Sequence, residues 1–400
     1  RAKNSMTNKL IRALVCAVLI TVTLSLFYFI SNANYPKASN WNWNVSSLLR
    51  DKRGYIRYEC NTPRHGCGGW ADRLKGILST YALSLILNRN FLFEMTQPCF
   101  VNTVVRPNKV NWDARRQIIP EPLNKQTINF KYDYKLMKDL ETVNIKSFFE
   151  KYDNYNLLSV ESSIMISDSL SVNPSVREKI IELGYDPLKF KVRHQFFRWY
   201  NALFKLAPKP NDEYKILLSR AKPNPRTLLI CAQVRIGKRS KNGYDDSLFA
   251  HESSAQRFWN FIRMTFVNNF NQQQHYEDYR IFVTSDKDEI KRDAEKVFGL
   301  EKVVYNAAAS SHMDKDYANL NENCENIQST IVDFHMLQNC DAAVVSHSSF
   351  GVLGAWNRRD PSTQFYVFTK PNQSHLKKDY WNRDDLEFIK IEDLDYLYFL

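Results

Sequence analysis

Hydrophobic and polar positions along this chain follow two different periods, and the changes between them predict strands and helices in turn. Tyr55–Glu59 alternates apolar and polar side chains as a strand does. From Leu74 to Leu85, apolar residues recur at the spacing of one helix face. Phe91–Phe93 then predicts a second, buried strand. A strand, a glycine-rich loop, a helix and another strand in this order are typical of the beginning of a parallel α/β layer.

A second set of strands and helices is predicted after residue 225. Strands are predicted at 227–234, 281–284, 303–305, 342–345 and 364–368, and helices at 288–297, at 327–337 and directly after the loop 346–351. Prolines in Ala207–Asp212 and Lys222–Pro225 indicate a linker before this set, whereas residues 100–210 show no clear period. We therefore predict two α/β domains, at 54–215 and 216–400, with a ligand-binding cleft between them.

The most apolar stretch of the chain is Ala13–Ile30, which contains no charged residue. As a helix it is about 27 Å long, close to the hydrocarbon thickness of an early secretory membrane. The residues before it include four cations and no acid, which places them in the cytosol. A cleaved signal peptide is the alternative, but its apolar core is usually shorter and ends in small residues, unlike Phe27–Ile30. We predict a cytosolic tail at 1–12, a transmembrane signal-anchor at 13–30 and a short stem at 31–53.

Cysteines and glycosylation motifs agree with this topology. Six cysteines follow the apolar stretch, an even number that favours disulfides without fixing their pairing: Cys60, Cys67, Cys99, Cys231, Cys324 and Cys340. Asn44 and Asn372 begin N-glycosylation motifs. The net charge of +12 is spread without a basic block, which argues against a nucleic-acid partner and weakly favours a small anionic substrate. A lumenal catalytic domain in the Golgi or endoplasmic reticulum is predicted, in a single-pass type II membrane protein.

Two loops that follow predicted strands carry groups suited to phosphate. Gly66–Gly76 is rich in glycine and opens a helix, so backbone N–H groups can approach an anion, although Asp72 can equally serve only as the helix cap. Gln233–Arg239 places Arg235 directly after a buried strand, and its planar guanidinium suits two oxygens of a diphosphate. The alternative for Arg235 is an ion pair with a neighbouring carboxylate.

Two further loops complete the candidate site. In Ile281–Asp288, the Asp286-x-Asp288 pattern is also how metal-dependent glycosyltransferases hold Mn²⁺, although the same pattern recurs at Asp314 and Asp316. In Ser346–Gly351, hydroxyl groups and a helix N-terminus suit phosphate oxygens. A serine hydrolase is disfavoured because no G-x-S-x-G motif is present, and zinc-protease and P-loop motifs are absent from the sequence as well.

Taken in order, these loops resemble the fucosyltransferase superfamily that contains α1,2-, α1,6- and protein O-fucosyltransferases. Gly68–Phe93 is similar to its N-terminal motif, and Ala232–Gly237 to its His-x-Arg-[Arg/Ile]-Gly motif, with Gln233 in place of the histidine. Ile281–Asp286 resembles the second donor motif and Asp333–Gly351 the third, whose Ser-Ser-Phe touches the nucleotide.

The resemblance implies a GT-B-like fold of two Rossmann-like domains, GDP-fucose as the donor, no metal or other cofactor, and inversion at the anomeric carbon. It assigns donor binding to Gly68, Gly69, Arg73, Gln233, Arg235, Gly237, Asp286, Ser348, Ser349 and Phe350. Arg235 and Asp72 are the predicted catalytic residues, with His65 and Asp245 as further candidates for the base. Because Gln233 replaces the histidine, the identity of the donor sugar stays open.

The predicted function is therefore transfer of fucose to a hydroxyl group of a glycan or glycoprotein. Two alternatives remain. One is an Mn²⁺-dependent nucleotide-sugar transferase that uses Asp286 and Asp288. The other is a non-catalytic lumenal glycan-binding protein whose tryptophans and tyrosines stack on sugars, although such a protein has no need of a phosphate-directed arginine.

Overall fold

A computed structural model describes residues 54–60, 68–97, 99–117, 124–130, 134–237, 253–270, 275–308, 320–369 and 386–397. The predicted anchor at 13–30, the stem, and both glycosylation motifs, at Asn44 and Asn372, lie outside these residues. Of the helices in the described ranges, none combines the length and apolarity needed to cross a bilayer. Residues from Lys52 onward form one compact unit.

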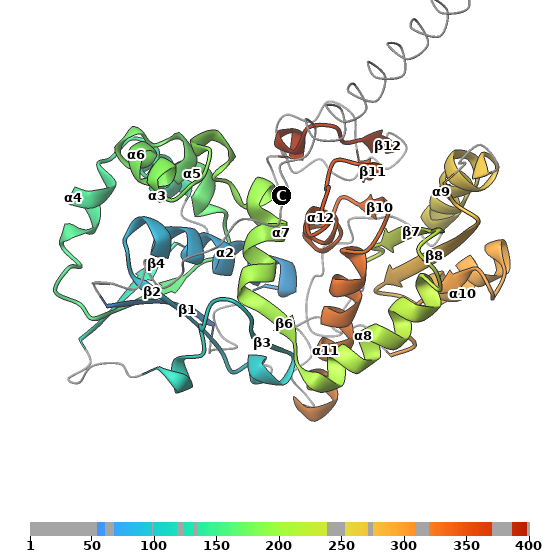
Figure 1. Cartoon of the computed structure of the whole chain (residues 1–400), viewed down its shortest axis with the longest axis horizontal. Helices are drawn as coiled ribbons and strands as arrows, with labels where there is room; N and C mark the ends of the chain where they lie inside the picture. The colour runs from blue at the N-terminus through green and yellow to red at the C-terminus, as the bar shows by residue number, and fades with distance from the viewer. Residues whose placement is uncertain are drawn as a thin grey trace, which may run out of the picture. The chain divides into compact units, whose positions relative to one another are not determined.

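The first sheet has four parallel strands in the order β2-β1-β5-β4 (Figure 1). They are β1 (Tyr55–Cys60), β2 (Asn90–Met95), β4 (Lys125–Asn129) and β5 (Leu157–Glu161). Helix α2 (Trp70–Ile86) connects β1 to β2 and buries the apolar face predicted from the sequence. Gly76 lets this helix approach the sheet closely, because a Cβ there would lie 1.9 Å from the carbonyl oxygen of Ser162.

Residues 100–206, whose pattern gave no prediction, fill the rest of this half. They supply the two inserted strands β4 and β5 and a small antiparallel pair, β3 (Val105–Pro107) and β6 (Phe204–Leu206). Their helices are α3 (Tyr134–Asp139), α4 (Ile145–Glu150), α5 (Ile166–Val172), α6 (Arg177–Glu182) and α7 (Val192–Leu203).

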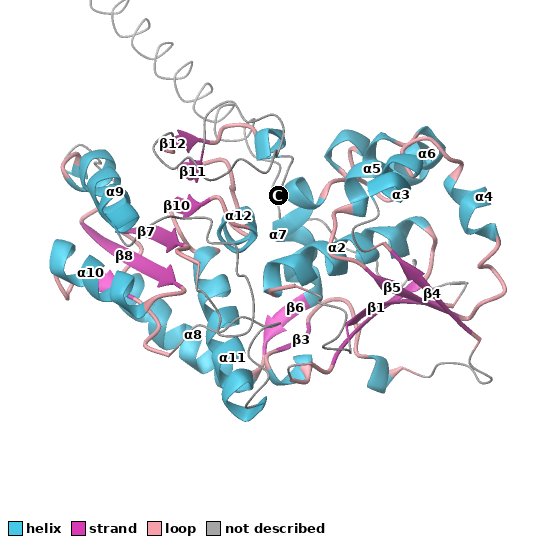
Figure 2. Cartoon of the chain, turned by 180° about the vertical axis from the view of Figure 1, so that it is seen from behind, coloured by secondary structure: helices cyan, strands magenta, loops and turns pink. Residues whose placement is uncertain are grey.

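The second sheet has six strands in the order β12-β11-β10-β7-β8-β9, parallel except for the β11–β12 pair (Figure 2). They are β7 (Thr227–Val234), β8 (Asp278–Ser285), β9 (Val303–Val304), β10 (Ala342–Ser346), β11 (Phe365–Thr369) and β12 (Glu387–Lys390). Numbered along this half, their spatial order is 3-2-1-4-5-6, the order of Rossmann folds. The five predicted strands are confirmed.

The helices of this half are α8 (Pro208–Ala221), α9 (Ser253–Ile262), α10 (Asp288–Phe298), α11 (Leu320–Leu337) and α12 (Ser349–Trp356). The prediction of a linker at Ala207–Asp212 is wrong, because α8 begins at Pro208. Proline is well tolerated in the first turn of a helix, where its missing N–H has no intrahelical partner. Leu217 and Ala221 on the buried face of α8 share an apolar cluster with Val332 of α11.

One apolar core joins the two sheets. Helix α12 packs against both α2 and α7, and Phe196 of α7 contacts the rings of Phe334 and Trp356 from the second half. Two disulfides are present in the described part, as the cysteine count predicted. Cys231–Cys340 lies within the second half, whereas Cys99–Cys324 ties the loop after β2 to α11, across 225 positions of sequence. The two halves are therefore fixed to one another by packing and by a covalent bond.

We expect the Cys99–Cys324 bond to contribute strongly to stability, because it closes a very long loop in the unfolded chain. The Cys99→Ala/Cys324→Ala double variant should lose about 2–5 kcal/mol of unfolding free energy, measured by urea denaturation without reductant. Each single variant should lose as much as the double variant, since either one breaks the bond. An unchanged midpoint in the double variant would show that the packed core alone fixes the two halves.

Candidate functional site

The strand order of the second sheet creates a switch point between β7 and β10. At such a point the connections leave in opposite directions, and ligands bind in the crevice beyond the carboxyl ends of the strands. The loop after β7 carries Arg235, and the loop after β10 carries Ser348 and Ser349. The two loops touch, because the backbone N–H of Arg235 donates to Oγ of Ser346, 2.9 Å away.

Gln233 connects the same two loops deeper in the structure. Its side chain is 4% exposed, and its Oε1 accepts a hydrogen bond from Oγ of Ser348 at 3.2 Å. A Cβ on Gly351 would lie 2.3 Å from that oxygen, so the glycine leaves the space that the amide occupies. The residue that replaces the motif histidine thus holds the start of α12 in place.

Asp286 fixes the direction of the chain after β7. Its two carboxylate oxygens accept the backbone N–H groups of Ile236, at 2.9 Å, and Gly237, at 2.8 Å. Nη1 of Arg235 lies 3.6 Å from the same carboxylate. Gly237 has a φ of +82°, which glycine adopts at little cost. The ion pair expected as the alternative for Arg235 therefore exists, and it orients a guanidinium that remains 22% exposed.

Asp288 does not share a site with Asp286 in this structure. It is the first residue of α10, is half exposed, and pairs with Nζ of the buried Lys291 at 3.0 Å. One aspartate thus holds a loop backbone, and the other stabilises the first turn of a helix.

The N-terminus of α12 faces the same loops. Ser348 is the cap residue, and its Oγ accepts from the backbone N–H of Gly351 at 3.3 Å. Free N–H groups in the first turn give this end a partial positive charge. The neighbouring His347 contributes no charge at neutral pH, because burial lowers its pKa to about 4. Its Nδ1 is 2.9 Å from the hydroxyl of Thr369.

The glycine loop of the first half also reaches this region. Gly68 has a φ of +75°, and Asp72 caps α2 by accepting from the backbone N–H of Gly69 at 3.3 Å. Lys75 on the next turn pairs with Asp72 at 2.8 Å and donates to Oγ of Ser349 at 3.3 Å. This contact brings Gly66–Gly76 and Ser346–Gly351, two of the four candidate loops, together in the structure.

Two residues expected to contact the donor instead pack within the protein here. Arg73 is 1% exposed, and its guanidinium donates to the carbonyl oxygens of Gly68 and Gln97, both at 3.0 Å. Phe350 packs edge-on against Phe334, with ring centroids 5.5 Å apart. Both support the loops on which the candidate site is built. His65 and Asp245 lie outside the described residues.

Asp333 on α11 was not singled out as a site residue from the sequence. It is 2% exposed, and its Oδ2 accepts from the hydroxyl of Thr284, at the end of β8, at 2.7 Å. Its other oxygen, Oδ1, makes no hydrogen bond of normal geometry with the described residues, although the side chain of Asn306 lies close enough to lower the pKa of this carboxyl group. Burial raises the pKa of Asp333 to about 6, although the Thr284 hydrogen bond and the charge of Lys291 offset part of this. A single carboxylate within the apolar run from Ile331 to Phe334 was the available signal.

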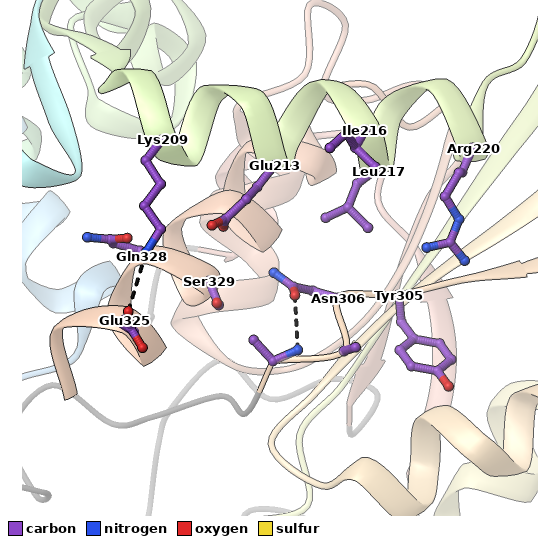
Figure 3. Close-up of a pocket in the computed structure, with 12 residues that line it drawn as sticks. Lys209, Glu213, Ile216, Leu217, Arg220, Tyr305, Asn306, Glu325, Gln328 and Ser329 are labelled. Carbon is purple, nitrogen blue, oxygen red and sulfur yellow. Dashed lines mark hydrogen bonds and ion pairs between the residues drawn. The ribbon is translucent and has the colours of Figure 1, made fainter. Parts of the chain in front are cut away.

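A cavity of about 410 Å³ opens between α8, α11 and the loop after β9 (Figure 3). Asp333 does not line it, but Asn306, which lowers the pKa of Asp333, does. The polar lining of the cavity includes Lys209, Arg220, Asn306 and Ser329, and the ring of Tyr305 forms one side. Ser329 is one helical turn before Asp333 on the same face of α11. The polar groups at the carboxyl edge thus run from β10 through β7 and β8 to β9.

Comparisons with known proteins give the fold. No protein-family model matches the chain, and no curated protein matches it either. A point mutant of FUT1 from Arabidopsis thaliana, solved with GDP, is 11% identical over 87% of this chain and 77% of its own, with a TM-score of 0.53. The fucosyltransferase NodZ from Bradyrhizobium is 12% identical over 85% of this chain and 99% of its own, with a TM-score of 0.42. The chain has an α/β, GT-B-like fold with parallel sheets that resembles fucosyltransferase structures.

We expect the two aspartates of the Asp286-x-Asp288 pattern to differ sharply when removed. Asp286→Ala leaves two backbone N–H groups without their acceptor and should lower the free energy of unfolding by about 2–3 kcal/mol. Asp288→Ala removes a half-exposed carboxylate from the buried Lys291, whose Nζ still donates to the carbonyl oxygens of Asn306 and Ala308, and should cost less, about 1 kcal/mol. Thermal denaturation of both variants measures this. Equal losses would contradict the role assigned to Asp286.

Proposed function

We propose that this protein is a glycosyltransferase that transfers fucose from GDP-fucose to a hydroxyl group of a glycan or glycoprotein, without a metal and with inversion. The observation that carries the proposal is the Arg235 guanidinium, oriented by Asp286 beside the N-terminus of α12 at the switch point. The fold resembles that of a plant FUT1 solved with GDP, which supports a nucleotide-sugar donor.

The sheet geometry suggests how the donor lies. Arg235 and Ser348 are placed to bind the diphosphate beyond the carboxyl ends of β7 and β10. Neighbouring strands are about 4.8 Å apart, so a nucleoside that extends along the edge reaches the end of β8, where Thr284 holds Asp333. Oδ1 of Asp333, which makes no hydrogen bond of normal geometry with the described residues, is suited to accept from N–H groups of guanine, which adenine does not present in the same positions. The adjoining cavity leaves room beside that base.

The proposed reaction is a direct displacement at C1 of the sugar. The acceptor oxygen forms a bond to C1, and the C1–O bond to the β-phosphate breaks with its electron pair on the departing GDP. Arg235, the Ser348 and Ser349 hydroxyls and the N–H groups of α12 would stabilise that charge. The acceptor's proton passes to a base, for which Asp72 is our candidate. Its carboxylate is 38% exposed, at the start of α2.

The Mn²⁺-dependent alternative requires Asp286 and Asp288 to bind one ion together. In the structure the first is engaged by two backbone N–H groups and the second by Lys291. Activity that is unchanged in EDTA would exclude this alternative. A lectin would be recognised by the absence of GDP binding in isothermal titration.

The membrane topology is part of the proposal. We propose a single-pass type II protein of the Golgi or endoplasmic reticulum, with the catalytic unit in the lumen. The apolar segment Ala13–Ile30 and its preceding cations support this orientation. The disulfides Cys99–Cys324 and Cys231–Cys340 support an oxidising compartment.

Arg235→Ala should lower the rate of transfer from GDP-fucose roughly 10²- to 10³-fold, because the guanidinium no longer stabilises the negative charge that develops on the leaving diphosphate. Arg235→Lys should recover little, since an ammonium lacks the two-pronged geometry. Arg280→Ala is the matched control. Arg280 is similarly exposed and pairs with Asp278, but lies at the amino end of β8. Near-normal turnover by Arg235→Ala would refute the assignment.

The proposed contact between Asp333 and guanine predicts that the affinity for GDP depends on pH. In the folded protein the pKa of Asp333 is about 6, above the ordinary value of 3.8. Asp333 is therefore ionised at pH 7.5 and becomes protonated as pH falls through about 6. GDP affinity should therefore fall about tenfold for each pH unit below 6. Asp333→Asn should bind GDP about tenfold more weakly at pH 7.5 and show no such dependence.

The free energy of unfolding distinguishes a contact of Asp333 with the nucleotide from a purely structural role of Asp333. Because the buried ionised carboxylate is disfavoured, unfolding free energy decreases as pH rises from about 4 to about 6. Asp333→Asn should therefore be at least as stable as the wild type at pH 7.5. The control Asp168→Asn replaces a second buried carboxylate, paired with Arg193, whose pKa burial also raises to about 6, and it should keep its GDP affinity. If Asp333→Asn binds GDP as tightly as the wild type does, the proposed contact between Asp333 and guanine is disproved.

A further inference from the structure

Lys291 on α10 is a buried ammonium group that no step of the proposed reaction uses. The residue is 1% exposed, and its Nζ donates to the carbonyl oxygens of Asn306, at 3.1 Å, and Ala308, at 3.4 Å. It also pairs with Asp288 at 3.0 Å, but that carboxylate is half exposed. Burying an ammonium group costs free energy unless its donors are satisfied and opposite charge lies near. Two of these three compensating groups belong to the loop after β9.

The loop that Lys291 binds brings Asn306 to Asp333. Oδ1 of Asn306 accepts the backbone N–H of Ala308 at 3.1 Å (Figure 3), so its NH2 group is the end that can donate to a carboxylate. The side chain of Asn306 lies close enough to Asp333 to lower the pKa of that carboxyl group. Lys291, Asn306 and Asp333 therefore form one connected set, from α10 through the loop to α11.

Lys291 is also the one charged group of the described residues that shifts the pKa of Asp333. Burial raises this pKa to about 6, and the Thr284 hydroxyl, Lys291 and Asn306 act in the opposite direction. His335, two residues along α11, is neutral above a pH of about 4 because burial lowers its pKa. The charged side chains of α8 line the neighbouring cavity, which Asp333 does not line: Lys209, Glu213 and Arg220. Ionisation of Asp333 therefore depends on the charge of Lys291.

These contacts give Lys291 a role in nucleotide binding. We propose that Lys291 is a positioning residue that holds the loop after β9 against Asp333 and keeps the Asp333 carboxylate ionised. Lys291 does not touch the nucleotide and acts only through Asp333 and Asn306. This inference rests on the proposed contact between Asp333 and guanine, and adds the residue that sets the pH range of that contact.

A purely structural role for Lys291 makes a different prediction. If Lys291 only anchors the loop to α10, its removal lowers stability and weakens GDP binding by the same factor at every pH. If its charge keeps Asp333 ionised, its removal weakens binding only where Asp333 becomes protonated, and that pH rises. The ratio of variant to wild-type affinity isolates this effect, because titration of the GDP phosphates is common to both proteins.

The test is isothermal titration of the full chain with GDP between pH 5.5 and pH 8.5, in EDTA. In Lys291→Met, the pH below which the affinity falls should rise by about one unit. The variant should therefore bind GDP about threefold more weakly than the wild type at pH 6.5, and about equally at pH 8.5. Lys291→Arg should restore the wild-type profile, because it retains the charge.

Two controls separate the charge of Lys291 from its other contacts. Asp288→Asn breaks the ion pair but leaves the ammonium group in place, so the pH below which affinity falls should not rise. Lys302→Met is the matched lysine variant. Lys302 pairs with Asp278 at 2.7 Å, at the amino end of β8, and its removal should leave the profile unchanged.

The outcomes are distinct. A wild-type pH profile in Lys291→Met overturns the inference and leaves Lys291 as a structural anchor of the loop. If Lys291→Met does not fold, Lys291→Gln provides the same test, because its amide can still donate to the loop carbonyls while the charge is absent. If the wild-type chain does not bind GDP at all, the proposed function fails, and the inference fails with it.

Discussion

Two hydrogen bonds to one carboxylate determine the geometry of the candidate site. Asp286 accepts the backbone N–H groups of Ile236 and Gly237, and so sets the direction in which the chain leaves β7. Arg235 stands directly before these residues, and its guanidinium is oriented by the same carboxylate. A site that stabilises a leaving diphosphate without a metal depends on donors that are already in position. Asp286, which in the sequence forms half of an Asp-x-Asp metal-binding pattern, thus orients Arg235 in the structure.

The rigidity of the loops has its source in the core that the two halves share. Packing of α12 on α2 and α7 places the N-terminus of α12 against Lys75 in the second turn of α2. The Cys99–Cys324 bond fixes the same two halves covalently. Because this framework is apolar and continuous, the polar contacts of Lys75 with Ser349 and of Gln233 with Ser348 can be specific without having to hold the halves together themselves.

The sequence was informative where one physical rule decided the outcome. Buried strands such as Thr227–Val234 are largely continuous apolar runs, and their alternation with helices along the chain predicted the second α/β half. Residues 100–206 were unreadable because their order in space depends on long-range pairing, with β5 inserted beside β1. The proline pattern misled at Pro208, where it begins a helix. Lys75 and Asp333 escaped prediction because a single charge in an apolar stretch does not reveal which partner faces it across the fold.

The central claim is that this carboxyl edge holds a guanine nucleotide diphosphate through fixed protein donors. Isothermal titration of the full chain with GDP, ADP and UDP, in EDTA at pH 7.5, tests it most directly. We predict that GDP binds at least tenfold more tightly than the other two, because Arg235 and α12 contact the diphosphate of all three and Asp333 contacts guanine alone. Equal binding of the three nucleotides, or GDP binding that requires added Mn²⁺, would contradict the account.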